Sequence, residues 1–273
     1  MGLAPFFFLL LAACRPLAPP QEPVRALVDL EEQADFGKLQ LSGGRRERGD
    51  QVIAALSGLA RRSQERLRPI LDDPRLVRSW QGFTVVNRLL VEATPAGLKA
   101  LRKHPEVASV VLEQELPEPA LMGPSPPGLG EGPGVRALDG KGVIVGVIDS
   151  GASAVHEQLS ANFRDWFDPE GKSPEPRDTR FGHGTGVLSV AVGRKIGIAP
   201  GATWIACAAL PRGRYNNVLA TQCADWMLNT GRPDVLIAAW VLPTPGCDRS
   251  LQRIVDAWRA AGILPVFPAG NYG

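Results

Sequence analysis

The second half of the sequence contains four mainly apolar runs, and these constrain the fold more than any other feature. The runs span residues 143–149, 203–210, 234–241 and 263–270. Apolar stretches without alternating polar residues are typical of strands that are buried on both faces of a sheet. Helical candidates separate them, at residues 184–192, 219–228 and 251–261. The alternation predicts an α/β fold with a parallel, doubly wound sheet, whose functional residues lie beyond the carboxyl ends of the strands.

Residues 24–116 show a different pattern, which predicts a separate small unit. Strand-like segments are expected at residues 24–30, 83–93 and 107–114, and helices at residues 51–71 and from Pro95 to His104. Thr94 and Pro95 form a typical helix start, with a capping hydroxyl followed by proline at the first helical position. The overall order, strand-helix-strand-strand-helix-strand, predicts a ferredoxin-like α/β unit. Residues 117–136 are rich in proline and glycine and are expected to link this unit to a second domain at residues 137–273.

The amino terminus has the features of an export signal. Residues 2–14 are uncharged and apolar but too few to span a bilayer as a helix. The end of this run, Leu11-Ala12-Ala13-Cys14, resembles the bacterial lipobox, which implies a signal peptide at residues 1–14, lipid attachment at Cys14 and a proline-rich tether at residues 15–23. The alternative is a plain signal peptide in which Cys14 is incidental. Either interpretation predicts an exported protein, as a cell-envelope lipoprotein or in secreted form.

The net charge and the cysteines indicate which partners and which cysteine bonds to expect. The net charge of +2 is too small to indicate binding to nucleic acid or to a membrane surface. Membrane contact is therefore expected only through the lipid anchor. Cys223 and Cys247 lie outside the predicted strands, and an exported chain allows them to form a disulfide. Cys207 lies within an apolar run and is predicted to be a buried thiol. The spacing of the cysteines does not match a zinc site.

Three residues at strand or helix ends are candidates for catalysis. Asp149 follows the first apolar run, His183 opens the next helical segment, and Asn271 follows the last apolar run. Taken singly, each is a common turn or loop residue. Taken together, an acid, a histidine and an amide in this order form a much more specific pattern.

The segments Asp149-Ser-Gly, His183-Gly-Thr and Ala-Gly-Asn271 resemble three successive signature segments of the subtilisin-like serine peptidases. Residues 24–115 are similar to the inhibitory propeptide of that family, especially in its bacillopeptidase F-like branch. The resemblance implies that His183 is the general base, that Asp149 orients it, and that Asn271 donates to the oxyanion. It also implies polypeptide substrates, the chain's own propeptide as a partner, and no cofactor for the chemistry. Structural calcium is common in the family, but no residues of this sequence can be assigned to it.

The sequence departs from that family at the nucleophile. Residues 1–273 contain no Gly-Thr-Ser segment opening a helix and no Gly-x-Ser-x-Gly. We therefore expect the amino-terminal part of a serine endopeptidase precursor, with an incomplete subtilisin-type sheet and without activity on its own. The alternative is a non-catalytic product whose propeptide-like unit binds or inhibits a subtilisin-like protease. A dinucleotide-binding fold is not favoured, because the first apolar run lacks the glycine-rich fingerprint.

Overall fold

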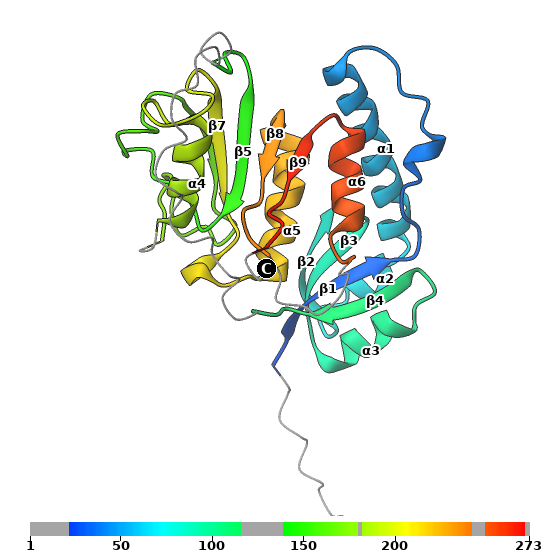
Figure 1. Ribbon diagram of the computed structural model, residues 1–273. Coiled ribbons are helices and arrows are strands. Elements are labelled where there is room, and N and C mark those ends of the chain that lie inside the picture. Colours follow the sequence, from blue (N-terminus) through cyan, green and yellow to red (C-terminus); the bar gives the residue numbers. More distant parts are fainter. Residues whose placement is uncertain (1–21, 116–138, 180–181, 242–248, 271–273) are drawn as a thin grey trace, which may run out of the picture.

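The computed structural model describes residues 22–115, 139–179, 182–241 and 249–270 of the 273-residue chain. These residues form two α/β units that lie against each other (Figure 1). Several predictions fall outside the described residues: the signal and tether, lipid attachment at Cys14, the linker, the pairing of Cys247, and the role of Asn271.

The amino-terminal unit is a four-stranded antiparallel sheet with helices on one side. Its elements are β1 (Val24–Leu30), α1 (Arg45–Glu65), α2 (Arg68–Leu71), β2 (Val77–Phe83), β3 (Arg88–Ala93), α3 (Pro95–Lys103) and β4 (Val107–Leu112). The strands are hydrogen-bonded in the order β2-β3-β1-β4. This is the order of a ferredoxin-like fold, as the sequence predicted. The predicted start of α3 is also correct, since the Thr94 hydroxyl accepts a hydrogen bond from Gly97 N at 3.2 Å.

Two boundaries differ from the predictions. The helix expected at residues 51–71 begins six residues earlier, at Arg45, and is interrupted before Arg68. Pro69 explains the interruption, because it cannot donate the backbone hydrogen bond that would continue the helix. The strand expected at residues 83–93 is instead the end of one strand, a turn, and a second strand. Asp225 holds that turn by accepting hydrogen bonds from Thr84 N at 2.7 Å and Val85 N at 2.8 Å.

The second unit contains a five-stranded parallel sheet. Its strands are β5 (Ile144–Asp149), β6 (Phe163–Phe167), β7 (Thr203–Ala208), β8 (Val235–Ile237) and β9 (Leu264–Val266). Its helices are α4 (His183–Val192), α5 (Asn217–Trp226), continued by a π turn at Met227–Gly231, and α6 (Gln252–Ala260). The strand order is β6-β7-β5-β8-β9, and every neighbouring pair is parallel. The α/β fold with a parallel sheet is therefore confirmed.

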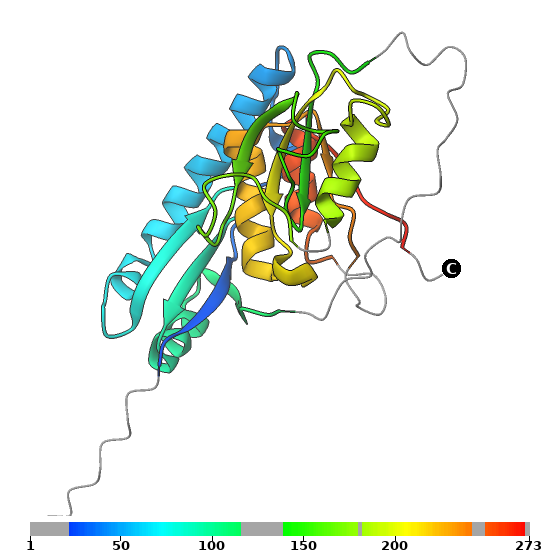
Figure 2. The same cartoon turned by 90° about the vertical axis from the view of Figure 1, so that its left-hand side faces the viewer.

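Helices cover both faces of this sheet, and one face also receives the amino-terminal unit. Helix α4 packs through Leu188 and Val192 on one face, against Val147 and Trp204. Helices α5 and α6 cover the other face, and α1 lies beside them (Figures 1 and 2). Val52 and Leu56 of α1 are buried in the same apolar cluster as residues of α5 and α6. The two units thus share a core.

The structure corrects the disulfide prediction. Cys207 is paired with Cys223, with a Cα–Cα distance of 5.7 Å, and is not a free thiol. The physical reason is that Cys207 is on the face of β7 against which α5 packs, and that face brings it opposite Cys223 in the core. Sequence alone does not reveal which face of β7 a residue occupies when all of its neighbours are apolar.

Strand β6 was not predicted, and β9 lies at an edge. Strand β6 is an edge strand that is only half-buried, so it contains charged residues at 164 and 165 and has no apolar run by which the sequence could predict it.

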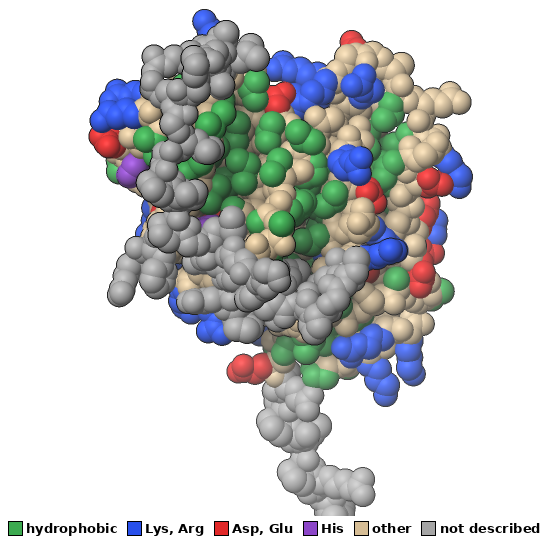
Figure 3. Space-filling model, in the orientation of Figure 1, with side chains coloured by type: hydrophobic (Ala, Val, Ile, Leu, Met, Phe, Trp, Pro, Cys, Tyr) green, Lys and Arg blue, Asp and Glu red, His purple; other side chains and the backbone are tan. Residues whose placement is uncertain are grey.

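At the opposite edge of the sheet, Leu264, Val266 and Phe267 are 60%, 44% and 41% exposed. Apolar side chains are visible over this part of the surface (Figure 3). Among the described residues, strand β9 pairs only with β8. Within the described ranges, no helix combines the length and apolarity needed to cross a membrane.

Candidate active site

The carboxyl end of β5 and the start of α4 bring two of the predicted residues into contact. His183 Nδ1 lies 2.7 Å from Asp149 Oδ1. The Asp149 side chain is fully buried and that of His183 is 9% exposed. The two residues are 34 positions apart in the sequence, so their contact depends on the parallel sheet and not on local geometry.

The backbone around this pair is shaped by glycine and by short hydrogen bonds. A side chain at Gly184 would collide with the carbonyl of Gly151 and would lie 3.1 Å from Asp149 Cβ, so only glycine lets α4 start this close to β5. Ser150 N donates to Asp149 Oδ1 at 2.7 Å, which fixes the carboxylate from its own turn. The Asp-Ser-Gly and His-Gly-Thr segments are therefore complementary in shape as well as in chemistry.

Asp178 is a positioning residue that the sequence analysis did not identify. Its Oδ2 accepts hydrogen bonds from Thr185 N at 2.7 Å and Thr185 Oγ1 at 2.6 Å, in the first turn of α4. Its Oδ1 accepts a hydrogen bond from Ser150 Oγ at 2.7 Å, and Ser150 Oγ in turn accepts one from Gly184 N at 3.1 Å. Asp178 thus ties the Asp149 turn to the helix that carries His183. In the sequence it is one acidic residue in a polar loop, with no pattern that distinguishes it.

The electrostatics of the pair favour a protonatable imidazole. The hydrogen bond to Asp149 raises the pKa of His183 above its ordinary value, burial opposes this, and the charge of Asp178 adds a smaller upward effect. His183 Nε2 and Asp149 Oδ2 are both buried and have no hydrogen-bond partner among the residues described. Since Nδ1 faces Asp149, Nε2 is the ring nitrogen left to exchange a proton with a further group.

Two hollows are lined by residues that lie next to the pair in the sequence. One, of about 450 Å³, lies beyond the ends of the strands and is lined by residues such as Ser150, Trp166 and Arg212. The other, of about 890 Å³, lies against α4 and the 153–156 loop, with Gly186 and Ser189 in its wall. Neither wall includes Asp149 or His183, so the hollows border the residues next to the pair, while His183 Nε2 itself is buried.

The remaining histidines and the acidic residues give no second site. His104 caps the end of α3, as its position predicted, and His156 accepts a hydrogen bond from Gln158 N at 3.3 Å. No group of three or more His, Cys, Asp or Glu residues within the described ranges is arranged to hold a metal ion.

Comparison with known proteins points to one family. Residues 140–273 match the sequence profile of the Subtilase family of peptidases. Bacillopeptidase F of Bacillus subtilis (strain 168) is 25% identical over 307 aligned positions, which cover 93% of this chain and 21% of that protein. The subtilisin-like protease PopC of Myxococcus xanthus (strain DK1622) is 27% identical over 166 positions, covering 50% of this chain and 35% of PopC.

The chain thus spans about a fifth of one relative and about a third of the other. Among solved structures, a cold adapted subtilisin-like serine proteinase is 23% identical, with a TM-score of 0.40 over 49% of this chain and 48% of that chain. The alignment with Bacillopeptidase F covers nearly the whole chain and so extends into the amino-terminal unit.

Proposed function

Residues 140–273 form a domain of the subtilase family, and we propose that this domain uses Asp149 and His183 as two members of an Asp-His-Ser triad that hydrolyses peptide bonds. The observation that carries the proposal is the buried 2.7 Å contact between them, which leaves His183 Nε2 without a partner among the described residues. This is the arrangement that a general base needs in order to take a proton from a hydroxyl nucleophile.

In this proposal each residue has a distinct task. Asp149 accepts a hydrogen bond from Nδ1–H, so Nε2 keeps its lone pair and faces the nucleophile. When Nε2 takes the proton, the adjacent carboxylate stabilises the imidazolium, and the proton is later given to the leaving amine. Asn271, which lies outside the described residues, is proposed to donate its side-chain N–H to the oxyanion of the tetrahedral intermediate. No metal or cofactor takes part in these steps.

The nucleophile is proposed to come from sequence outside residues 1–273, because no Gly-Thr-Ser segment occurs within them. The first test is to sequence the gene beyond codon 273 in all three frames. A Gly-Thr-Ser segment followed by a helical pattern would support the peptidase. A stop codon with no such segment nearby would contradict it for this product.

Activity provides the second test. In the product of the complete gene, His183→Ala is expected to lower kcat by about 10⁶-fold, the size of the effect when subtilisin itself loses its histidine. His156→Ala is the matched control, since His156 lies in a neighbouring loop and contacts neither Asp149 nor His183. Activity that survives His183→Ala would exclude the proposed base. The chain of 273 residues alone is expected to hydrolyse no peptide above background.

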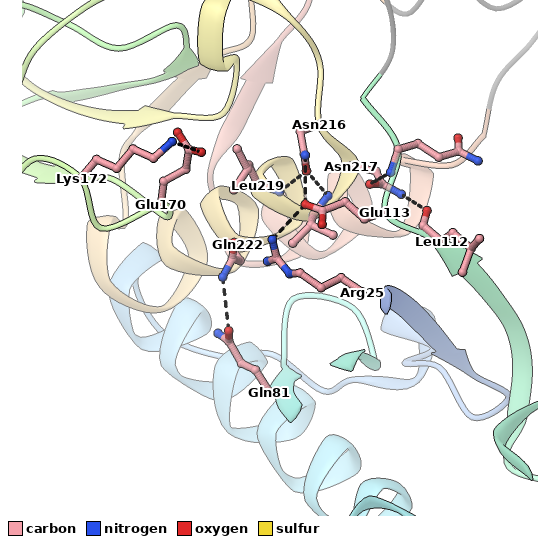
Figure 4. Close-up of polar contacts among 12 residues, drawn as sticks. Arg25, Gln81, Leu112, Glu113, Glu170, Lys172, Asn216, Asn217, Leu219 and Gln222 are labelled. Carbon is pink, nitrogen blue, oxygen red and sulfur yellow. Dashed lines mark hydrogen bonds and ion pairs between the residues drawn. The ribbon is translucent and has the colours of Figure 1, made fainter. Parts of the chain in front are cut away.

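The amino-terminal unit is proposed to be a propeptide that stays docked on this domain. Its contacts are specific: Asn217 Oδ1 accepts from Gln114 N at 2.9 Å, and Asn217 Nδ2 donates to the carbonyl of Leu112 at 3.2 Å (Figure 4). Asn216 Nδ2 donates to Glu113 Oε1 at 3.0 Å, and Glu113 also pairs with Arg25. The end of β4 is therefore held at the start of α5 through its backbone as well as through one carboxylate. Hydrogen bonds to the main chain are a recurring way of holding an extended peptide segment.

A second candidate function is inhibition of another subtilisin-like protease by this unit. It is favoured by the separate apolar cluster of the unit, built from β1, β3 and α3 residues such as Val28, Leu89 and Leu101. The test adds the full chain to a subtilisin and measures inhibition. Asp225→Ala removes the acceptor that holds the Thr84 turn, so it is expected to free the unit and to increase inhibition in trans. Asp256→Ala, on the neighbouring helix α6, is the control. No inhibition by either variant would exclude this candidate.

Export with a lipid on Cys14 is proposed from the sequence and from the similarity to Bacillopeptidase F. The test is labelling with a radioactive fatty acid in a bacterial host. Cys14→Ser is expected to abolish labelling, and Cys247→Ser is expected to leave it unchanged.

A further inference from the structure

A hollow lined by arginines lies where the amino-terminal unit meets the amino edge of the parallel sheet. It measures about 370 Å³, and its wall includes Arg45, Arg46, Arg164 and Arg232. Arg45 and Arg46 begin α1, Arg164 belongs to β6, and Arg232 follows the π turn after α5. Both units therefore contribute guanidinium groups to one cavity, at the opposite end of β5 from Asp149. Lys and Arg side chains are visible at this end of the molecule, at the top of Figure 3.

Two of these arginines are fixed in place by their surroundings. Arg45 forms an ion pair with Asp234, and its Nε donates to the carbonyl of Gly262 at 2.8 Å. Arg232 pairs with Asp50 at 2.6 Å and donates to the carbonyl of Arg46 at 3.2 Å. These two side chains join the units and form the rigid part of the cavity wall.

Two locally unfavourable backbone features accompany the position of the Arg232 side chain. Gly49 lies in the second turn of α1, where glycine is unfavourable, and a Cβ there would lie 2.8 Å from the guanidinium of Arg232. Arg232 itself has a positive φ of 48°, a left-handed conformation that is unfavourable for a residue other than glycine. The left-handed Arg232 ends the π turn, and the absence of a side chain at Gly49 lets its guanidinium lie against the first turns of α1.

The other two arginines have no acidic partner among the described residues. The side chains of Arg46 and Arg164 are exposed and form no ion pair with a described residue. Asp234 and Asp50 pair with two of the four guanidiniums, Arg45 and Arg232, which leaves a charge of +2 around the cavity. Glu47, also in the first turn of α1, is already bound to Gly44 N at 2.7 Å and does not line the cavity.

We propose that this cavity binds a phosphate-type oxyanion that bridges the two units. A di- or trivalent oxyanion matches the excess charge, and the planar guanidinium forms two parallel hydrogen bonds to such a group. The amino end of the long helix α1 adds a partial positive charge on the same side. Because the anion contacts residues of both units, it binds the docked form and stabilises the docking of the amino-terminal unit. The proposal does not depend on the peptidase function.

The test uses the full chain and titrates it with inorganic pyrophosphate at an ionic strength held constant with sodium chloride. Calorimetry is expected to show saturable binding of one anion per chain, and the thermal unfolding midpoint is expected to rise with pyrophosphate. Arg46→Gln and Arg164→Gln are each expected to weaken binding at least tenfold. Arg61→Gln is the matched control, since Arg61 is an exposed arginine of the same helix that does not line the cavity, and it should leave the affinity unchanged. The unfolding midpoint without pyrophosphate shows whether each variant is folded.

A parallel experiment with vesicles that contain phosphatidic acid, whose phosphomonoester headgroup can carry two charges, identifies the source of the oxyanion. Sedimentation with vesicles that is lost in Arg164→Gln, together with weak binding of pyrophosphate, would assign the site to a lipid headgroup. Saturable pyrophosphate binding without sedimentation would assign it to a free anion. The proposal is overturned if neither ligand binds to the folded chain, or if binding is equal in the wild type, Arg46→Gln and Arg164→Gln.

Discussion

The two units of the molecule differ in how fully their buried polar side chains are hydrogen-bonded. In the amino-terminal unit, Ser63, Gln64 and Asn87 are buried and hydrogen-bonded to one another and to the backbone. Asn87 alone donates to Glu32 O at 2.7 Å and to Ser63 Oγ at 2.6 Å. In the parallel-sheet unit, five buried side-chain atoms lack a partner among the described residues; they belong to Asp149, Thr179, His183, Ser189 and Gln222.

Buried polar groups that are hydrogen-bonded stabilise the fold, whereas buried polar groups without a hydrogen bond still have the capacity to bind a further group. A buried group without a hydrogen bond costs about 1–3 kcal/mol, so folded proteins keep few of them. Their concentration in one unit, two of them on the Asp149–His183 pair, is what a reaction centre predicts. The satisfied network of the other unit is what a docking module needs, because its task is to hold a shape.

The largest effect is expected at Asn87. Asn87→Ala removes the side chain that links Glu32, Ser63 and Gln64, and it leaves buried groups unpaired, so the free energy of unfolding is expected to fall by about 2–4 kcal/mol. Chemical denaturation of the full chain measures the change. Gln81→Ala is the control, because exposed Gln81 makes one hydrogen bond, to Gln222, and a change within about 0.5 kcal/mol is expected. Equal losses in both variants would show that the buried network does not hold the fold.

The disulfide gives the second effect and a test of the shared core. Cys207 and Cys223 close a loop with a sequence separation of 16, for which chain entropy alone gives about 3 kcal/mol. The Cys207→Ala/Cys223→Ala double variant is expected to lose about this much stability. Peptide mapping without reduction is expected to recover the Cys207–Cys223 linkage. Recovery of a Cys223–Cys247 linkage would instead support the pairing suggested by the sequence.

Ser189 provides the opposite test in the parallel-sheet unit. Its hydroxyl is buried and has no partner among the described residues, so Ser189→Ala removes an unsatisfied group at little cost in packing. The free energy of unfolding is expected to stay the same or to rise by about 1 kcal/mol. Ser63→Ala is the matched substitution in the other unit, where the hydroxyl accepts from Asn87, and it is expected to be destabilising. A large loss for Ser189→Ala would mean that the hydroxyl has a structural partner after all.

Sequence patterns predicted the parts of the fold that depend on local periodicity. The apolar runs gave β5, β7, β8 and β9, and the order of the three motifs placed Asp149 and His183 at adjacent ends of a strand and a helix. The start of α3 followed from Thr94 and Pro95 alone. These features are predictable because each is determined by residues that are close in the sequence.

The features that sequence patterns missed depend on contacts between distant segments. Asp178 matters because of where the Asp149 turn and α4 meet, and the partner of Cys223 depends on how α5 lies on the sheet. The turn after β2 is set by Asp225, which is 141 residues away from Thr84. None of these partners can be read from the neighbours of the residue concerned.

The smallest effect, and the most specific to the proposed reaction centre, is the titration of His183. Its pKa is raised mainly by the hydrogen bond to Asp149. A raised histidine pKa means that the folded state binds the proton more tightly than the unfolded state. The contribution to stability is therefore fully present below the unfolded value of about 6.5 and is lost as the pH rises through the folded pKa. Asp149→Asn is expected to lower the pKa of His183, followed by NMR of the imidazole nitrogens in the full chain.

Asp149→Asn is also expected to remove the part of the free energy of unfolding that declines as the pH rises from about 6.5 through the folded pKa of His183. Asp178→Asn, which changes the weakest of the upward influences, is expected to lower the pKa of His183 less than Asp149→Asn does. If the titration of His183 were the same with aspartate or asparagine at position 149, the buried contact would be a packing contact. In that case the unpaired buried atoms of Asp149 and His183 would not be evidence for a reaction centre.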